Sequence, residues 1–192
     1  MKRKALLAIT GCTIKAFETY AYRDFLPIAA TDSGWKDYSI EDAFALKVLT
    51  DAAQGIDLAS ASILANGALH ALHPLNPFAY MGDENIWVAI VSYHWPEAPQ
   101  DWVQKTVVAG RWSDIETKAK IFVAGLASDA AITGVFAVSA KNIANHVLTE
   151  ARDFGLAEGE VQSVPDDLTG YPDWFQDIEG KRRALFSIEA EK

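Results

Sequence analysis

Residues 5–20 read ALLAITGCTIKAFETY, and they predict the architecture of the N-terminal part of the chain. Its first apolar residues suit one short helix over residues 2–9. Gly11 then supplies the backbone freedom that a tight turn needs. Thr13 is a suitable N-cap for a second helix over residues 14–24. Two short helices joined in this way form a helix-turn-helix unit.

The second of these helices has one apolar side. Ile14, Phe17 and Ala21 stand at positions i, i+3 and i+7, which predicts an inward-facing stripe. The residues predicted to face outward are Lys15, Glu18, Thr19 and Tyr22. Leu26-Pro27 is predicted to end the helix, because proline cannot continue it.

Residues 28–38 are predicted to form two short extended pieces around Asp32-Ser33-Gly34, and therefore a hairpin. Ser39-Ile40-Glu41-Asp42 resembles a capping box and predicts a helix that runs to about Gln54. Asp57-Leu58-Ala59-Ser60 predicts the start of a further helix that runs to about His70.

A domain boundary is predicted near residues 73–84, because Pro74 and Pro77 cannot continue a helix. The charge changes at the same place. Residues 1–72 carry seven Lys/Arg and eight Asp/Glu, a net of −1, whereas residues 73–192 carry ten and eighteen, a net of −8. We therefore predict one domain over residues 1–72 and an acidic domain over residues 84–192.

The second part of the chain predicts an α+β module with a small sheet. Strands are predicted over residues 86–93, 102–108 and 132–138, the second with a short helix as the alternative. A helix is predicted from a capping box at Ser113 to about Ala127. A second helix is predicted over residues 140–154, between the N-cap Ser139 and Gly155. An acidic loop is predicted over residues 158–180, followed by a final helix over residues 181–190.

Several short motifs between residues 5 and 65 carry a family resemblance. They are Thr10-Gly11, Thr13-Ile14-Lys15, Phe17, Tyr20, Phe25-Leu26-Pro27, Gly34-Trp35-Lys36-Asp37-Tyr38-Ser39 and Gly55-Ile56-Asp57-Leu58. In order and spacing they resemble the winged-helix DNA-binding domain of MerR-type regulators. The fold class is therefore predicted as α+β, with a MerR-like winged helix-turn-helix followed by a small α+β domain.

The resemblance implies that residues 14–24 lie in the DNA major groove and that the hairpin touches the flanking backbone. The implied DNA-binding residues are Thr13, Lys15, Ala16, Glu18, Thr19, Tyr20, Lys36 and Tyr38. Lys15 and Lys36 match arginines of the family pattern, and lysine pairs with phosphate or with guanine. Glu18 departs from the pattern, because it replaces an arginine and its carboxylate repels phosphate. It could instead accept a hydrogen bond from a cytosine amino group.

The leading functional prediction is a sequence-specific DNA-binding regulator of transcription, from a bacterium or a phage. Its acidic module senses a ligand, self-associates or binds a protein partner. Pro74 and Pro77 exclude the long dimerisation helix of a typical MerR regulator, so a homodimer is predicted through residues 84–155 instead. The alternatives are a phage-type architectural protein, such as an excisionase or small terminase subunit, and a winged-helix interaction module that no longer binds DNA.

The composition excludes several other classes. The net charge of −9 argues against a protein that coats nucleic acid or anionic membrane with its whole surface. Cys12 is the single cysteine, so no intramolecular disulfide can form. No apolar run reaches the length of a membrane span, and a cytoplasmic protein is predicted. Neither a phosphate loop nor a nucleophile motif is present, and His70 and His73 lack further ligands, so neither an enzyme nor a metal or other cofactor is predicted.

Overall fold

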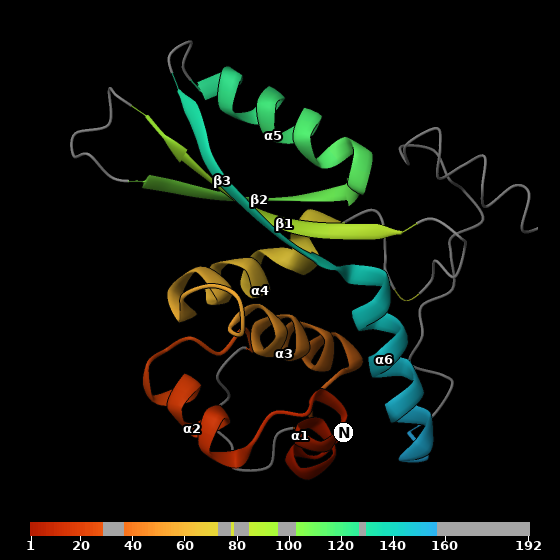
Figure 1. Cartoon of the computed structure of the whole chain (residues 1–192). Helices are drawn as coiled ribbons and strands as arrows, with labels where there is room; N and C mark the ends of the chain where they lie inside the picture. Colours follow the sequence, from red (N-terminus) through yellow and green to blue (C-terminus); the bar gives the residue numbers. More distant parts are fainter. Residues whose placement is uncertain (29–36, 73–77, 79–84, 96–102, 127–129, 157–192) are drawn as a thin grey trace, which may run out of the picture.

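A computed structural model describes residues 1–28, 37–72, 78, 85–95, 103–126 and 130–156. In these ranges the chain forms helices around a three-stranded antiparallel sheet (Figure 1). The elements in chain order are α1 (Arg3–Thr10), α2 (Ile14–Tyr22), α3 (Ile40–Ala52), α4 (Leu58–Leu72), β1 (Ile86–His94), β2 (Val103–Arg111), α5 (Trp112–Leu126), β3 (Ala131–Ser139) and α6 (Ala140–Asp153).

The two N-terminal helices have the connection that the sequence predicts. Gly11 ends α1 with φ of 66°, a left-handed conformation that glycine adopts without strain. The Oγ1 atom of Thr13 accepts a hydrogen bond from the backbone N–H of Ala16 at 3.1 Å and caps α2. The chain leaves α2 earlier than predicted, at Tyr22, and Asp24 then takes a positive φ of 58°.

The starts of α3 and α4 are also as predicted. The Asp42 N–H donates to Ser39 Oγ at 3.0 Å and the Ser39 N–H donates to Asp42 Oδ2 at 2.9 Å, which completes a capping box. At α4 the Ser60 N–H donates to Asp57 Oδ1 at 2.9 Å. The predicted hairpin lies mostly in residues 29–36, outside the described residues.

The sheet has the strand order β2-β1-β3 (Figure 1). β1 pairs with β2 from Ile86 opposite Arg111, and with β3 from Trp87 opposite Ser139. The register of the second pair shifts once, between Ser92 and Tyr93. The predicted strands are confirmed, and the second of them is a strand rather than the alternative helix.

The two faces of the sheet bury different sets of side chains. On one face Ile86, Val88 and Ile90 of β1 join a core formed with α1, α3, α4 and α6. On the other face the sheet packs against α5, which lies on the opposite side of the sheet from α3 and α4 (Figure 1). Residues on both sides of the predicted boundary thus share one hydrophobic core. Most of residues 73–84 lie outside the described ranges, and the division into two domains stays a prediction.

Small residues let the helical layer approach the sheet closely. A Cβ atom built on Gly67 of α4 would lie 2.8 Å from Val107 Cγ2 of β2. A Cβ atom built on Gly55, before α4, would lie 2.7 Å from Phe136 Cε2 of β3. These approaches are closer than van der Waals contact, so both positions require glycine at the present spacing.

The start of α5 differs from the prediction. α5 begins at Trp112, directly after the last residue of β2, so Ser113 lies inside the first turn and is not the N-cap. Its hydroxyl donates to Asp114 Oδ1 at 3.0 Å instead. The sequence signal failed because the strand passes into the helix without a loop.

The last described helix agrees with the sequence. Ser139 Oγ accepts from the Asn142 N–H at 3.2 Å and caps α6, whose apolar residues Ile143, Val147, Leu148 and Ala151 are buried. Gly155 follows with φ of 66°. The predicted acidic loop and final helix lie in residues 157–192, outside the described residues. None of the described helices is long and apolar enough to cross a membrane.

Candidate nucleic-acid interface

α2 packs on the core through one narrow side. Phe17 is buried, and Ala16 and Tyr20 are half-buried against the same core. The predicted inward stripe is therefore wrong at two positions, since Ala21 is exposed and Ile14 is 62% exposed. The spacing i, i+1, i+4 of residues 16, 17 and 20 also defines a helix face, and packing against the neighbouring helices selects it.

The opposite side of α2 is open to solvent. Ile14, Lys15, Glu18 and Tyr22 lie on this side, and Tyr22 is 91% exposed. In Figure 1 α2 lies at the edge of the molecule, on the side of α3 and α4 that faces away from the sheet. We call these four residues the outer face of α2.

The predicted DNA-binding residues divide between this face and the core. Thr13, Lys15 and Glu18 are exposed, as the resemblance implies. Ala16 and Tyr20 instead turn toward the core. Outside α2, Tyr38 is half-buried against the core, and Lys36 lies outside the described residues.

Two hydroxyl groups are engaged in local hydrogen bonds. Thr19 is half-buried, and its hydroxyl donates to the backbone oxygen of Lys15 at 2.8 Å. The Thr19 proton is thus used within α2, although the oxygen can still accept a hydrogen bond. The Thr13 oxygen is used as the cap, which leaves its proton free for an acceptor such as phosphate.

Burial shifts the pKa of two ionisable side chains beside the core, Cys12 and Tyr20. Desolvation raises the pKa of the Cys12 thiol and the pKa of the Tyr20 hydroxyl, so both stay protonated at neutral pH. A buried, protonated thiol is a poor nucleophile and a poor metal ligand. Cys12 therefore supports the turn between α1 and α2 as a small apolar residue.

An ion pair joins α1 to α2. The Arg3 Nη2 atom donates to Glu18 Oε1 at 3.0 Å, and the Arg3 guanidinium lies 5.1 Å from the centre of the Phe17 ring. The carboxylate that departs from the family pattern is thus neutralised by a cation of the preceding helix. Sequence reasoning missed Arg3, because a contact across the turn has no fixed residue spacing.

The helix-turn-helix carries a net positive charge in an acidic chain. Residues 1–28 contain five Lys/Arg and two Asp/Glu, a net of +3, whereas residues 37–72 contain one and five, a net of −4. Lys2 forms an ion pair with Asp37 at 2.8 Å. The side chains of Lys4, Lys15 and Arg23 form neither an ion pair nor a hydrogen bond within the described part of the chain. They are available to a negatively charged partner.

The described residues hold no group of three or more His, Cys, Asp or Glu side chains that could bind a metal ion. Comparison with protein-family models and with curated proteins gives no match for this chain.

Proposed function

We propose that this chain is a sequence-specific DNA-binding regulator of transcription of the MerR-like winged-helix type, with α2 as its recognition helix. One observation carries the proposal. The outer face of α2 is exposed on a two-helix unit with a net charge of +3, in a chain whose net charge is −9. Such a local concentration of positive charge attracts the phosphate backbone even when the whole protein is acidic.

The chemistry of this face suits the major groove. Lys15 can pair with phosphate or with the acceptor atoms of guanine, and the Thr13 hydroxyl can donate to phosphate from the start of the helix. Ile14 and Tyr22 add exposed apolar surface that can contact a thymine methyl group. Arg3 holds the Glu18 carboxylate, which reduces its repulsion of phosphate.

A second candidate is a winged-helix module that binds protein instead of DNA. The exposed Ile14 and Tyr22 side chains favour it, because aromatic and aliphatic residues are typical anchors of protein interfaces. An architectural DNA-binding protein, such as an excisionase or small terminase subunit, would also bind DNA through α2, but its role would be to organise DNA and not to regulate transcription. In each case the remainder of the chain would serve ligand sensing, self-association or partner binding.

A salt titration separates the DNA-binding candidates from the protein-binding one. Fluorescence anisotropy with a labelled random duplex is measured at about 50 mM and about 200 mM salt. DNA binding predicts affinity that falls steeply as salt rises, because phosphate contacts release counterions. Selection of bound genomic fragments then tests sequence preference. Absence of binding at the lower salt concentration would remove the DNA-binding proposal and favour the protein-binding module.

A further inference from the structure

β3 has an outer edge that no described strand covers. The order β2-β1-β3 places β2 and β3 at the two edges of the sheet. β2 carries Lys105 and Arg111, which are charges of the kind that protect an edge from further pairing. β3, with the sequence AITGVFAVS, has no charged residue and no proline over its nine residues. Its edge thus lacks the charges and the proline that keep a strand edge unpaired, and its one irregularity is the register shift opposite Ser92 and Tyr93.

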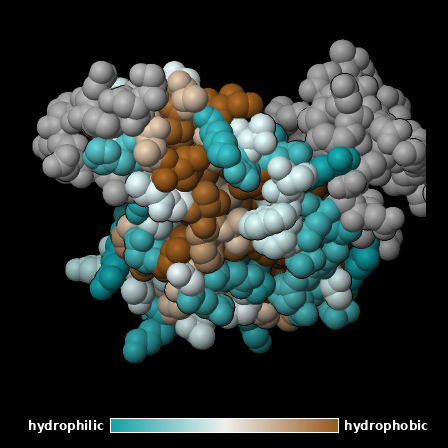
Figure 2. All heavy atoms as spheres, turned by 45° about the horizontal axis from the view of Figure 1, so that its top comes forward, coloured by the Kyte–Doolittle hydropathy of each residue, from teal (hydrophilic) through white to brown (hydrophobic). Residues whose placement is uncertain are grey.

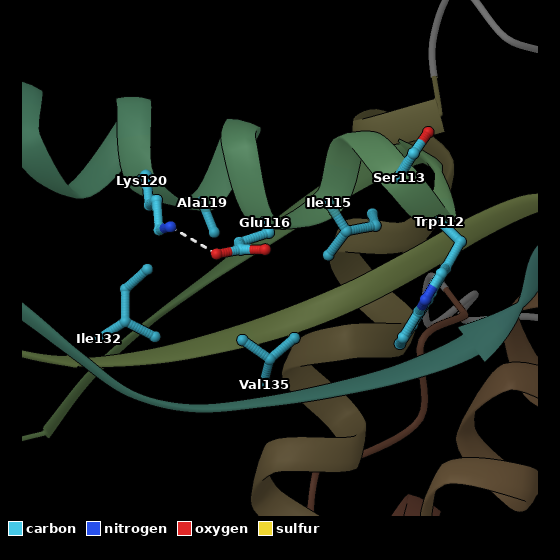
Figure 3. Close-up of a pocket in the computed structure, with 8 residues that line it drawn as sticks. All are labelled: Trp112, Ser113, Ile115, Glu116, Ala119, Lys120, Ile132 and Val135. Carbon is cyan, nitrogen blue, oxygen red and sulfur yellow. Dashed lines mark hydrogen bonds and ion pairs between the residues drawn. The ribbon is translucent and has the colours of Figure 1, made fainter.

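An apolar groove lies beside this edge, on the α5 side of the sheet. α5 makes its main contacts with β2 and β1 and fewer with β3, and among the described residues much of β3 stays exposed. The groove has a volume of about 410 Å³. Its lining residues are Trp112, Ser113, Ile115, Glu116, Ala119, Lys120, Ile132 and Val135 (Figure 3). The side chains of Ile132 and Val135 point from β3 toward α5 (Figure 3).

The groove belongs to an exposed apolar surface. Trp112 is 61% exposed and Val135 is 48% exposed, and Ile121 and Phe122 of α5 are exposed as well. Figure 2 shows a hydrophobic band on this side of the molecule, with hydrophilic residues on both sides of it. A contiguous apolar surface with a polar rim is typical of an interaction site.

The charges of the groove favour a second copy of the same chain. Two chains that each carry −9 repel one another, so the contact surface that adds least to this repulsion is one without net charge. The groove has one carboxylate, Glu116, and one ammonium group, Lys120, which form an ion pair. Each copy therefore contributes one negative and one positive charge to the groove, so a two-fold arrangement of two grooves has no net charge.

We propose that two copies of this chain dimerise by antiparallel pairing of their β3 strands. Antiparallel pairing of identical strands has two-fold symmetry, and Val135 is the central residue of β3. With the axis at Val135, the two sheets join into one sheet of six strands, three from each copy. The two grooves then meet above the paired strands, which covers Trp112 and Val135. This pairing does not depend on DNA, and it would also place two α2 helices on one assembly.

Light scattering on the full chain tests the proposal. At tens of micromolar, the wild-type chain is expected to have the mass of two 21.0 kDa chains. Val135→Lys places like charges opposite each other at the axis and is expected to raise the dimer dissociation constant by more than about tenfold. The matched control is Ile63→Lys, because Ile63 of α4 is similarly exposed, at 42%, and lies on another element. The control is expected to stay dimeric.

A cross-linking experiment keeps the test decisive if Val135→Lys fails to fold. Cys12 is the only cysteine, so Cys12→Ser gives a chain in which new cysteines can be placed singly. Residues opposite each other in antiparallel strands lie about 4.5–5.5 Å apart at Cα, within disulfide range. Mild oxidation should link two copies of Cys12→Ser/Val135→Cys and should not link Cys12→Ser/Ile63→Cys.

Several results would overturn the proposal. They are a monomeric wild-type chain, a Val135→Lys variant that dimerises as strongly as the control, and a Val135→Cys variant that gives no linked dimer. A monomer that instead binds a strand-forming peptide or a small apolar molecule in the groove would also overturn it. Because none of these measurements contains DNA, a dimer that does not bind DNA would count against the proposed function alone. A DNA-binding monomer would count against the dimer alone.

Discussion

Arg3 and Glu18 lie on consecutive helices, and their side chains meet with 3.0 Å between Arg3 Nη2 and Glu18 Oε1. Both side chains are substantially exposed, so the pair contributes at most about 1 kcal/mol to stability. The pair has a larger effect on the charge of the outer face of α2, because the positive charge of Arg3 offsets the negative charge of Glu18 beside Lys15.

Removing the Glu18 charge should strengthen DNA binding. Glu18→Gln releases Arg3 from its ion pair, and we expect higher affinity for random duplex with a salt slope steeper by about one unit. Glu18→Arg should strengthen nonspecific binding further. Glu116→Gln is the matched control, because Glu116 is also in an exposed ion pair but lies on α5. If both Glu18 variants bind DNA more weakly than the wild type, the Glu18 carboxylate supports the fold and our orientation of α2 is wrong.

Lys15 should contribute one phosphate contact. Lys15→Ala is expected to weaken binding to all sequences and to lower the salt slope by about one unit. Lys120→Ala removes the same charge from α5 and should leave the slope unchanged. Lys36→Ala is predicted to act like Lys15→Ala through the hairpin. The docking proposal fails if neither Lys15→Ala nor Lys36→Ala changes the anisotropy titration.

The approach of α4 to β2 predicts opposite effects for two glycine substitutions in helices. Gly67→Ala should destabilise the fold by about 1–3 kcal/mol, because its new Cβ would overlap Val107. Gly125→Ala has open space around its Cβ position, and should stabilise the fold by up to about 1 kcal/mol through helix propensity. Urea unfolding measures both free energies. The double variant Gly67→Ala/Val107→Ala should recover part of the free energy of unfolding that Gly67→Ala loses, because the smaller side chain at residue 107 relieves the overlap. Equal effects of Gly67→Ala and Gly125→Ala would contradict the close packing of α4 on β2.

The cap of α4 predicts a pH dependence. Hydrogen bonds from the hydroxyl and the N–H of Ser60 hold the pKa of Asp57 below its ordinary value of 3.8. A lowered pKa in the folded state means that the carboxylate stabilises the fold above about pH 4, and that this contribution is lost as the pH falls through the folded-state pKa. Asp57→Asn keeps a hydrogen-bond acceptor but cannot titrate. Its free energy of unfolding should therefore fall less than that of the wild type as the pH decreases below about 4.

Asp57→Ala removes the acceptor altogether and should cost about 1 kcal/mol at neutral pH. Urea midpoints measured at about pH 7 and about pH 3 for the wild type and both variants provide the comparison. Identical acid dependence of the wild type and Asp57→Asn would show that Ser60 does not lower the Asp57 pKa in solution.

The candidate site was predictable in part. Lys15 was predicted to face outward and is exposed, because a residue in the first turn of a helix has few neighbours to bury it. Ile14 and Ala21 were predicted to face inward and are exposed, whereas Tyr20, which the resemblance implied to contact DNA, is half-buried against the core. Hydrophobicity suggested that Ile14 is buried, but the partner surface accepts the side of α2 that contains Ala16, Phe17 and Tyr20. The Arg3 contact was not predictable, since it depends on the angle between two helices.

Much of the local structure of this protein follows from short stretches of its sequence. The turn at Gly11, the caps at Ser39 and Ser139, and the strand at Ile86–His94 depend on hydrogen bonds and side-chain preferences within a few residues. How these elements are used depends on long-range packing. Packing onto one core selected the buried side of α2 and placed Arg3 beside Glu18, and no described strand pairs with the outer edge of β3. These outcomes depend on surfaces that come together from distant parts of the chain, and no local sequence pattern contains that information.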